Sequence, residues 1–527
     1  MNRSFGRLNQ SQVRSYVRAL TETSRSCTSL VAIQIKQRHN SGSRKYSSSS
    51  NRENASKPTP TSSPGSKPAA KTPLQLLAAR IAAHADALAA AASERSHPAR
   101  SLSAKPATPA SLLPANAPIS ARSEQLALRD ALAEATLLAT DASEFVPELA
   151  VRNNQFASVR WLCHFDIPSL LPLEDSEHEA AANDEPSIFP SLPYSKVSSL
   201  ARVPEHQLRS IARMAMLAGF LSEPAPNRLS HSPLSAAMVR QPELLEWARF
   251  TTGTSAPMVG AMVEATERWG DDRSIHRTAY NAAWKTDLPL FAHVAANPEL
   301  QERYARYMRV MTRSRGMALG HLLQGWREGW ESLARRGGVL VDVGGSAGHA
   351  SAALAREFPG IRAVVQDREE VVARAKRDDA PRLEGEGLKV VFQAHDFFEA
   401  QPERPRGFED EGKGDVYFLR QILHDWGDDK CITILRHLAA ALERAGPDAR
   451  LVVMDTVLPS PGEGSRTVEA LLRVRDLTMQ QAHNAHERSR EEWEELLAKA
   501  HRGLVIKKIV QPFDSLMAVI EITLEAR

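Results

Sequence analysis

One histidine and two acidic residues stand where a sheet of parallel strands would place chemistry. His424 follows the strand-like run 415–419, Asp455 follows the run 450–454, and Glu487 lies further along the chain. The carboxyl ends of the strands carry the sites of open α/β sheets, and an imidazole can accept and return a proton at such a site. A lone histidine is more often structural, but the two acidic residues favour a functional role for His424.

A glycine-rich segment follows another strand-like run, at 339–343. It reads VDVGGSAG over 341–348, with Gly344 and Gly345 at its turn, and a helical pattern comes after it. Small residues let the backbone approach a ligand closely, but the G-x-G-x-x-G spacing of a dinucleotide site is absent. The segment predicts a ligand that contains a nucleoside and disfavours a dehydrogenase. A tight structural turn is the alternative.

Two more acidic residues follow the next strand-like runs, at 361–366 and 388–392. Asp367 can accept hydrogen bonds from a ribose diol, in a nicotinamide cofactor or in S-adenosylmethionine alike. Asp396 and Phe397 combine an acceptor for an exocyclic amine with an aromatic wall for a purine. Each acid alone is more often an ordinary loop residue, but placed along one edge of a sheet they support each other.

Strand-like and helical patterns alternate beyond residue 337, which predicts a parallel sheet flanked by helices. The last two strand-like runs, at 504–510 and 515–524, are separated only by a short Gln-Pro-Phe-Asp turn. A parallel connection needs a crossover of about a dozen residues or more, so these two runs should pair antiparallel. The predicted fold class is α/β, with a Rossmann-like, mostly parallel sheet that ends in an antiparallel hairpin.

The chain before the sheet is mainly helical. Two helical stretches, 195–201 and 205–218, flank a short turn, and the polar segment 223–231 could form a wing. These features predict a winged-helix module. Its second helix carries only Arg209 and Arg213 as cations, which favours a packing or dimerisation role over DNA binding.

Changes in composition divide the chain into four predicted domains. Residues 1–70 are rich in Ser and Arg and predict a disordered extension. Residues 71–150 hold Ala-rich helices and a Pro-rich linker, residues 151–330 the helical dimerisation and substrate domain, and residues 331–527 the ligand-binding sheet. An Arg-rich, Ser-rich start that is poor in acids also fits a mitochondrial transit peptide, with residues 12–20 as its amphipathic helix. We expect a cytoplasmic protein, with mitochondrial import as the alternative.

Composition argues against several classes of partner. The net charge of +3 is uneven: residues 1–70 carry 12 Lys and Arg against two Glu, so the rest of the chain stands at −7. The basic pI reflects this segment and is poor support for nucleic-acid binding by the folded part. The sequence has no uninterrupted run of about 18 apolar residues, so we expect no membrane span. Three scattered cysteines argue against a disulfide framework and a zinc cluster, so no metal is expected.

Six segments together resemble the class I-fold small-molecule O-methyltransferases of the plant caffeate and fungal sterigmatocystin type. They are VDVGGSAGHAS at 341–351, VVQD at 364–367, HDFF at 395–398, LRQILHDWGDD at 419–429, MDTVLP at 454–459 and HERSREEW at 486–493. The resemblance covers about residues 155–527. It implies an S-adenosylmethionine-dependent, metal-independent enzyme that forms a homodimer and methylates a hydroxyl of a small aromatic, polyketide- or phenolic-type secondary metabolite.

The resemblance also implies roles for individual residues at the cofactor. The residues assigned to S-adenosylmethionine are Gly344 and Gly345 for the methionine part, Asp367 for the ribose, Asp396 and Phe397 for the adenine, and Arg420 near the cofactor. Ser346 stands where many relatives have Gly, a departure that should narrow the loop only slightly.

At the substrate, the resemblance makes His424 the general base that removes a proton from the hydroxyl. Asp455 and Glu487 would orient and polarise its imidazole, and Asp455 stands where many relatives have Glu. Phe291, Met308 and Met311 are candidates for the pocket wall, although core packing is their commoner use.

Two alternatives stay open. A relative with this fold could methylate nitrogen or carbon, although His424 favours a hydroxyl. A methyltransferase-like regulator or scaffold without catalysis could bind a partner through the winged helix.

Overall fold

The computed structural model describes residues 70–100, 110–173, 190–408 and 415–525. The predicted extension at 1–70, including the helix at 12–20, falls outside them apart from residue 70, as does part of the Pro-rich linker. The described residues from 71 to 525 form one compact unit. The domain boundaries predicted at 150 and 330 within this unit stay predictions.

A seven-stranded sheet forms the C-terminal part of the chain, in the order β11-β12-β8-β7-β4-β5-β6. Its strands are β4 (Val339–Val343), β5 (Arg362–Asp367), β6 (Val390–Ala394), β7 (Val416–Arg420), β8 (Arg450–Asp455), β11 (Leu504–Val510) and β12 (Ala518–Leu524). β4 to β8 pair parallel, whereas β12 pairs antiparallel with both β8 and β11. The predicted α/β fold with a terminal antiparallel hairpin is therefore confirmed.

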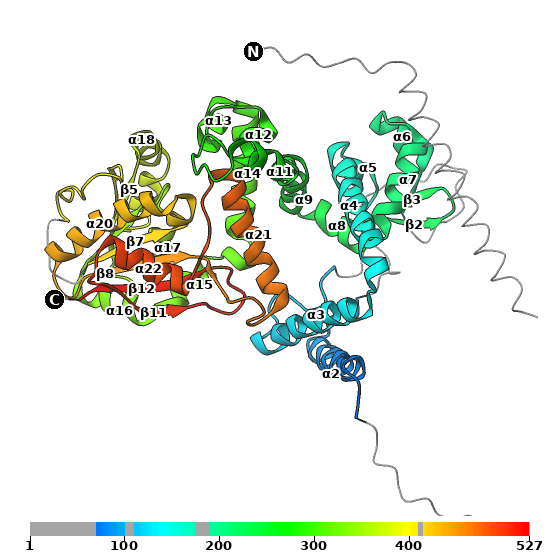
Figure 1. The fold of residues 1–527 in the computed structure, drawn as a ribbon, viewed down its shortest axis with the longest axis horizontal. Helices are drawn as coiled ribbons and strands as arrows, with labels where there is room; N and C mark the ends of the chain where they lie inside the picture. Colours follow the sequence, from blue (N-terminus) through cyan, green and yellow to red (C-terminus); the bar gives the residue numbers. More distant parts are fainter. Residues whose placement is uncertain (1–69, 101–109, 174–189, 409–414, 526–527) are drawn as a thin grey trace, which may run out of the picture. The chain divides into compact units, whose positions relative to one another are not determined.

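Helices bury both faces of this sheet (Figure 1). The helices on and beside it are α15 (Gly320–Gly325), α16 (Arg327–Arg336), α17 (His349–Glu357), α18 (Glu369–Asp378), α19 (Ala380–Gly385), α20 (Asp428–Ala445) and α22 (Arg490–Ala500). Leu451 and Val453 of β8 pack with α20 and α22, while Val452 and Met454 pack with α16 and α17. Burial on both faces explains why the strands read as unbroken apolar runs.

The order of the strands reverses between β4 and β7. β5 and β6 extend from one side of β4, and β7 and β8 from the other. Open α/β sheets bind ligands at such a reversal, beyond the carboxyl ends of the strands. The glycine-rich segment follows β4 and the His424 segment follows β7, so both predicted motifs lie at this point.

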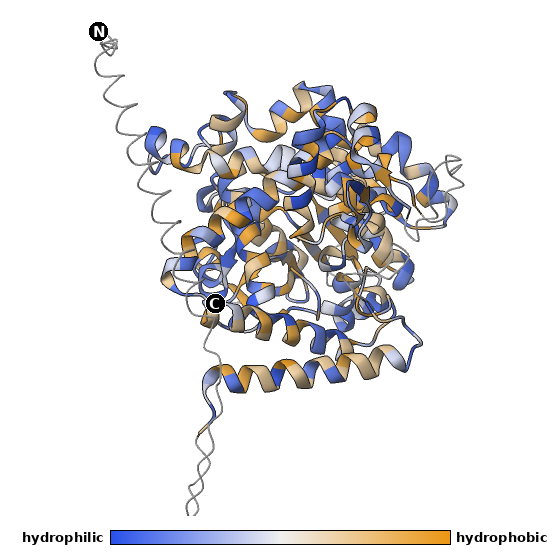
Figure 2. Ribbon diagram, turned by 90° about the vertical axis from the view of Figure 1, so that its right-hand side faces the viewer, coloured by the Kyte–Doolittle hydropathy of each residue, from blue (hydrophilic) through white to orange (hydrophobic). Residues whose placement is uncertain are grey.

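Helices also make up most of the chain before the sheet. They are α2 (Pro73–Ser93), α3 (Ile119–Ala139), α4 (Ala142–His164), α5 (Ile167–Leu170), α6 (Tyr194–Ala201), α7 (Glu205–Met216), α8 (Pro233–Arg240), α9 (Pro242–Phe250), α10 (Ala256–Gly260), α11 (Met262–Trp269), α12 (Ala279–Trp284), α13 (Leu290–Ala296) and α14 (Pro298–Arg313). Figure 2 shows apolar and polar residues alternating along many of the helices, as amphipathic helices require.

Short strands accompany α6 and α7. β1 (Leu192–Pro193), β3 (Arg228–Ser230) and β2 (Ser222–Ala225) form a small antiparallel sheet in that order. The two helices match the stretches predicted at 195–201 and 205–218 closely, and the wing segment 223–231 coincides with β2 and β3. The winged-helix assignment itself stays a prediction.

One helix of the described part, α2, is long and apolar enough to cross a membrane by length and composition alone. Its Leu88 is buried together with Leu113, Ala117 and Ala121, on and before α3. Packing against α3 therefore buries part of the apolar surface of α2.

Candidate active site

His424 lies in a single 3-10 turn, Leu423–Asp425, directly after β7. Its side chain is buried, and its Nδ1 is 3.0 Å from Oε1 of Glu487. A carboxylate can only accept a hydrogen bond, so Nδ1 carries the proton in this pair. The lone pair of a neutral His424 is then on Nε2, which faces the other way.

A short parallel strand pair brings Glu487 to this position from far along the chain. β10 (Arg488–Ser489) pairs with β9 (Val457–Leu458), with Arg488 opposite Val457. The side chain of Arg488 is buried and donates hydrogen bonds to the carbonyls of Leu423 and Trp426, each at 3.1 Å. One residue therefore fixes both the turn that carries His424 and the strand end that carries Glu487.

Helix α21 (Arg466–His483; Figure 1) adds contacts that the sequence did not suggest. Nη2 of Arg475 lies 3.3 Å from Oε1 of Glu487, and its Nε donates to Oγ1 of Thr456 at 2.8 Å. Asp476 accepts a hydrogen bond from the backbone N–H of Glu487 at 3.1 Å. Neither residue belongs to a recognisable motif, so only the tertiary structure could reveal them.

Asp455 departs from its expected place as an imidazole partner. It is the last residue of β8 rather than a residue beyond it, its side chain is fully buried, and neither carboxylate oxygen has a hydrogen-bond partner in the described structure. Its neighbour across the site, Asp425, has its Oδ1 3.6 Å from Nε2 of His424. Asp455 influences His424 through its charge, and Asp425 is a third acid that the sequence analysis did not single out.

These charges strongly perturb each other. Burial alone would lower the pKa of His424, but the negative charges of Glu487, Asp425 and Asp455 outweigh it and raise the pKa to about 9. Burial raises the pKa of Asp455 to about 7, against the opposing effect of His424. For Glu487 burial acts in the same upward direction, but the imidazolium and Arg475 hold the pKa of this carboxyl below its usual value.

The glycine segment after β4 has no room for larger residues. A Cβ on Gly345 would lie 2.6 Å from Cγ of Asp342, and one on Gly344, which has a φ of +75°, would lie 2.5 Å from Cδ1 of Ile422. A side chain at either position would displace its neighbours. The packing of this turn therefore requires both glycines, and their contact with the methionine part of S-adenosylmethionine stays a prediction.

The two acids predicted for the cofactor lie at the same edge of the sheet. Asp367 ends β5 and accepts hydrogen bonds from the backbone N–H groups of Arg368, at 2.8 Å, and Ser346, at 2.9 Å. Asp396 accepts one from the N–H of Phe398 at 3.0 Å. Backbone donors thus orient both carboxylates, which fits hydrogen bonding to ribose and adenine.

The remaining two cofactor candidates have other neighbours as well. The Phe397 ring lies beside the position where a Cβ on Gly344 would stand, which suits an adenine wall. Arg420 donates through Nη2 to the carbonyl of Met317 at 2.9 Å, and burial lowers its pKa against the opposing charges of Asp342 and Asp455. This contact ties β7 to the segment before α15.

The three residues predicted to line the wall of the substrate pocket lie in different environments. The Phe291 ring is half-exposed and lies 5.0 Å from the ring of His483. Met311 packs against the core of the sheet, and Met308 is half-buried on α14. Of the three, Phe291 has the contact that most directly connects it with the His424 cluster.

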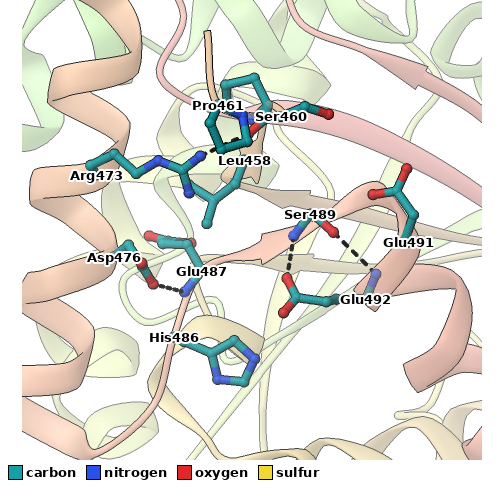
Figure 3. A pocket seen from close by; sticks show the side chains of 11 residues that line it. Leu458, Ser460, Pro461, Arg473, Asp476, His486, Glu487, Ser489, Glu491 and Glu492 are labelled. Atoms are coloured by element: carbon teal, nitrogen blue, oxygen red, sulfur yellow. Dashed lines mark hydrogen bonds between the residues drawn. The ribbon is translucent and has the colours of Figure 1, made fainter. Parts of the chain in front are cut away.

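A polar pocket of about 550 Å³ borders Glu487 on the side of β9 and β10 (Figure 3). Arg473, Asp476, His486 and Ser489 line it together with Glu487. His424 is not part of its lining. This pocket therefore lies behind the base cluster, not on the Nε2 side of the imidazole.

Known proteins resemble this chain both in sequence and in fold. The family model of the O-methyltransferase domain matches residues 268–502. The O-methyltransferase VdtC of Byssochlamys spectabilis is 39% identical over 453 residues, which are 86% of this chain and 98% of VdtC. The O-methyltransferase aurJ of Gibberella zeae is 38% identical over 423 residues, 79% of this chain and 90% of aurJ.

Solved structures share the fold at lower identity. OxaC matches with a TM-score of 0.59 and 18% identity over 85% of this chain and all of OxaC. LepI, solved in complex with SAM, matches with a TM-score of 0.57 and 21% identity over 77% of this chain and 96% of LepI.

The chain belongs to the O-methyltransferase family. Enzymes of this family take their methyl group from S-adenosylmethionine, and the two oriented carboxylates are compatible with that cofactor. The predicted fold, enzyme class and cofactor are thereby confirmed.

Proposed function

We propose that this O-methyltransferase methylates a hydroxyl of a small aromatic secondary metabolite, with His424 as the general base. The observation that carries the proposal is the buried hydrogen bond between Nδ1 of His424 and Glu487. It holds the proton of the neutral imidazole on Nδ1, so that the lone pair of Nε2 is available to a substrate hydroxyl, and it places a negative charge where an imidazolium would form.

The raised pKa makes the proton transfer easier. An ordinary imidazole with a pKa of about 6.5 faces a phenol of about 10, a gap of roughly 5 kcal/mol. With a pKa of about 9 for His424, this gap becomes smaller. S-adenosylmethionine supplies the methyl group in an activated, sulfonium form, so the chain's own task is to hold and deprotonate the hydroxyl.

The proton follows a short path in this proposal. Nε2 of His424 would take it from the substrate hydroxyl, and Glu487 would stabilise the imidazolium. Bound S-adenosylmethionine would supply the methyl carbon for the new O–C bond, and its sulfur would keep the electron pair of the broken S–C bond. Arg475, whose Nε donates to Thr456, keeps the Glu487 carboxylate in place through its ion pair. His424 loses a proton more readily when a cation is bound nearby, which favours the neutral base once the cofactor is in place.

The test is the variant His424→Gln, compared with His486→Gln as a matched control one residue before Glu487. We expect His424→Gln to lower kcat by about 10²-fold or more, while titration calorimetry shows S-adenosylmethionine binding within about threefold of wild type. His486→Gln should retain its turnover. Near-normal turnover of His424→Gln, or a folded wild type that does not bind the cofactor, would contradict the proposal.

We also propose that the protein is a homodimer. Helix α21 exposes Leu471, Val474 and Leu477 on its outer side, with 47%, 60% and 41% of their surface accessible. Contiguous exposed apolar residues of this kind commonly mark a protein interface, and the first helices of the chain expose more of them, including Phe145 and Val146 on α4.

Light scattering coupled to size exclusion tests the homodimer. The wild type should elute with the mass of two chains, and Val474→Glu should shift it towards one, because a charge is costly in an apolar interface. A wild type that is monomeric at micromolar concentration would refute this assembly, whatever its activity.

A further inference from the structure

A cavity of about 430 Å³ lies between the start of α3, the chain around α15 and the turn that joins β11 to β12. None of the residues assigned to the cofactor or to the base lines it. Its apolar wall consists of Ile119, Ala318, Val510, Pro512 and Phe513. Its polar side chains are Arg122, Arg315, His321, Gln324 and Asp514. The cavity is therefore separate from the candidate active site and combines apolar surface with charge.

Two arginines share one acid in this cavity. Nη1 of Arg122 is 3.0 Å from Oδ2 of Asp514, and Nη1 of Arg315 is 3.9 Å from the same oxygen. Neither contact has the geometry of a hydrogen bond, because Oδ2 of Asp514 and Nε of Arg122 are buried without a hydrogen-bond partner in the part of the chain that the structure describes. Two guanidinium groups beside one carboxylate leave one positive charge and several N–H donors for a ligand.

The chemistry of the lining indicates what this ligand is. A guanidinium binds a carboxylate or a phosphate through paired N–H groups, and a buried donor without an acceptor costs free energy. The guanidinium of Arg122 also lies 5.7 Å from the centre of the Phe513 ring, so the charge and the apolar wall are next to each other. A carboxylate on an aromatic or aliphatic body fits both features, whereas inorganic phosphate fits only the charge.

One wall of the cavity is also in contact with the candidate active site. The segment 315–318 contributes two lining residues and contains Met317 between them. The carbonyl of Met317 accepts a hydrogen bond from Arg420 at 2.9 Å, and its sulfur accepts one from Arg475 at 3.4 Å. A ligand that holds this segment in place also holds the acceptor of Arg420, so binding at the two sites should be coupled.

We propose that this cavity is a second ligand site, which takes a small organic carboxylate on Arg122 and Arg315, and that its occupation tightens cofactor binding through Met317. The site itself does not depend on the role proposed for His424. The coupling rests on the position of Arg420 near the cofactor.

Titration calorimetry of the full chain with 2-naphthoate tests the site. Naphthalene-2-carboxamide, a neutral compound of the same shape, isolates the contribution of the charge, and inorganic phosphate isolates that of the apolar body. Arg315→Gln removes one guanidinium at a side chain that is 55% exposed. Gly320→Phe keeps both arginines but fills the cavity, because Gly320 lines it and a Cβ there would have no atom within 4 Å. Arg313→Gln, at the exposed end of α14, is the matched control.

We expect 2-naphthoate to bind with saturation, and the carboxamide and phosphate to bind at least about tenfold more weakly. Arg315→Gln should weaken 2-naphthoate binding by about tenfold, the effect of one hydrogen bond between charged groups. Gly320→Phe should abolish binding, and Arg313→Gln should stay within about threefold of wild type. Circular dichroism shows whether each variant is folded.

Two results would overturn the site. One is a folded wild type that does not bind 2-naphthoate, and the other is binding that folded Arg315→Gln and Gly320→Phe both retain in full. Equal affinity for 2-naphthoate and phosphate would contradict the organic class of the ligand.

Cofactor titrations test the coupling separately. With 2-naphthoate at saturation, the Kd for S-adenosylmethionine should fall by about threefold or more, and saturating cofactor should lower the Kd for 2-naphthoate by the same factor. An unchanged Kd would overturn the coupling and leave the site. A Kd that rises in proportion to 2-naphthoate would place this compound in the cofactor site and overturn the proposal. Loss of turnover in His424→Gln bears on the proposed function alone, since neither titration involves that residue.

Discussion

The two halves of the site are built in different ways. At the edge predicted to bind the cofactor, backbone sets the geometry: a side chain at Gly344 or Gly345 would displace its neighbours, and two N–H groups orient the Asp367 carboxylate. At the base, the fit comes from buried charged side chains, with Glu487 on Nδ1 of His424.

The difference follows from the task of each half. Binding a ligand of fixed shape and charge needs rigid donors and acceptors, which backbone supplies without any change of its own pKa. Accepting a proton needs a group whose pKa has been moved, and burial among charges moves it. Changes at the cofactor edge should therefore alter affinity, and changes at the base should alter rate and its pH dependence.

Among the variants that distinguish the cofactor edge from the base, Asp367→Ala should have the largest effect, and that effect should fall on cofactor affinity. It removes two oriented acceptors for the ribose, each worth about 1.5 kcal/mol as a charged hydrogen bond, so the Kd for S-adenosylmethionine should rise about 100-fold. Calorimetry measures the Kd, and the pH profile of kcat at saturating cofactor should not move. A shifted pH profile would mean that the two halves are not independent.

The variant Glu487→Gln should have a smaller effect than Asp367→Ala, and the effect should fall on the rate and its pH dependence. His424 must be neutral to act as a base, so kcat/KM of the wild type should rise with pH towards about 9. Gln retains the shape but not the charge that most raises the pKa of His424. The rise should then occur at lower pH, and the plateau should fall by about tenfold because the imidazolium is less stabilised.

The pH dependence of the free energy of unfolding tests the interaction of His424 with Glu487 independently. The pKa of His424 is raised on folding, so its stabilising contribution is complete below the unfolded value of about 6.5 and is lost as pH rises through about 9. Glu487→Gln should destabilise most below pH 6.5 and least above 9 in denaturant titrations. A loss of stability that does not depend on pH would indicate a packing defect in place of the charge effect.

The sheet was largely predictable because its strands are continuous apolar runs between turns. The bounds predicted for 339–343 and 504–510 coincide with β4 and β11, and the antiparallel hairpin follows from the length of its turn. Strand ends were less certain: β8 extends to Asp455, which the sequence placed just beyond it. That one-residue difference, with the pleat that buries the side chain, leaves Asp455 without a hydrogen-bond partner in the described structure.

The surroundings of His424 were only partly predictable. Glu487 was identified as its partner, and the structure puts the two side chains in contact. Arg475 and His483 lie on α21 among ordinary helical residues, and only the packing of that helix directs them towards the site. Such residues carry no local signal, because their role depends on which face of the helix is buried.

The smallest expected effect tests whether the cofactor edge depends on backbone alone. Ser346 has a φ of +51°, in the left-handed region, and its N–H, not its hydroxyl, meets Asp367. Ser346→Gly removes strain of about 1 kcal/mol but adds a similar entropy to the unfolded chain, so stability should change by less than about 1 kcal/mol. Because the N–H stays, the Kd for S-adenosylmethionine should stay within about threefold by calorimetry. Ser346→Ala, which keeps the strain, should bind equally well. If both variants bound the cofactor tenfold more weakly, the hydroxyl would be a ligand in its own right, and the contrast between a backbone-built cofactor edge and a side-chain-built base would not hold.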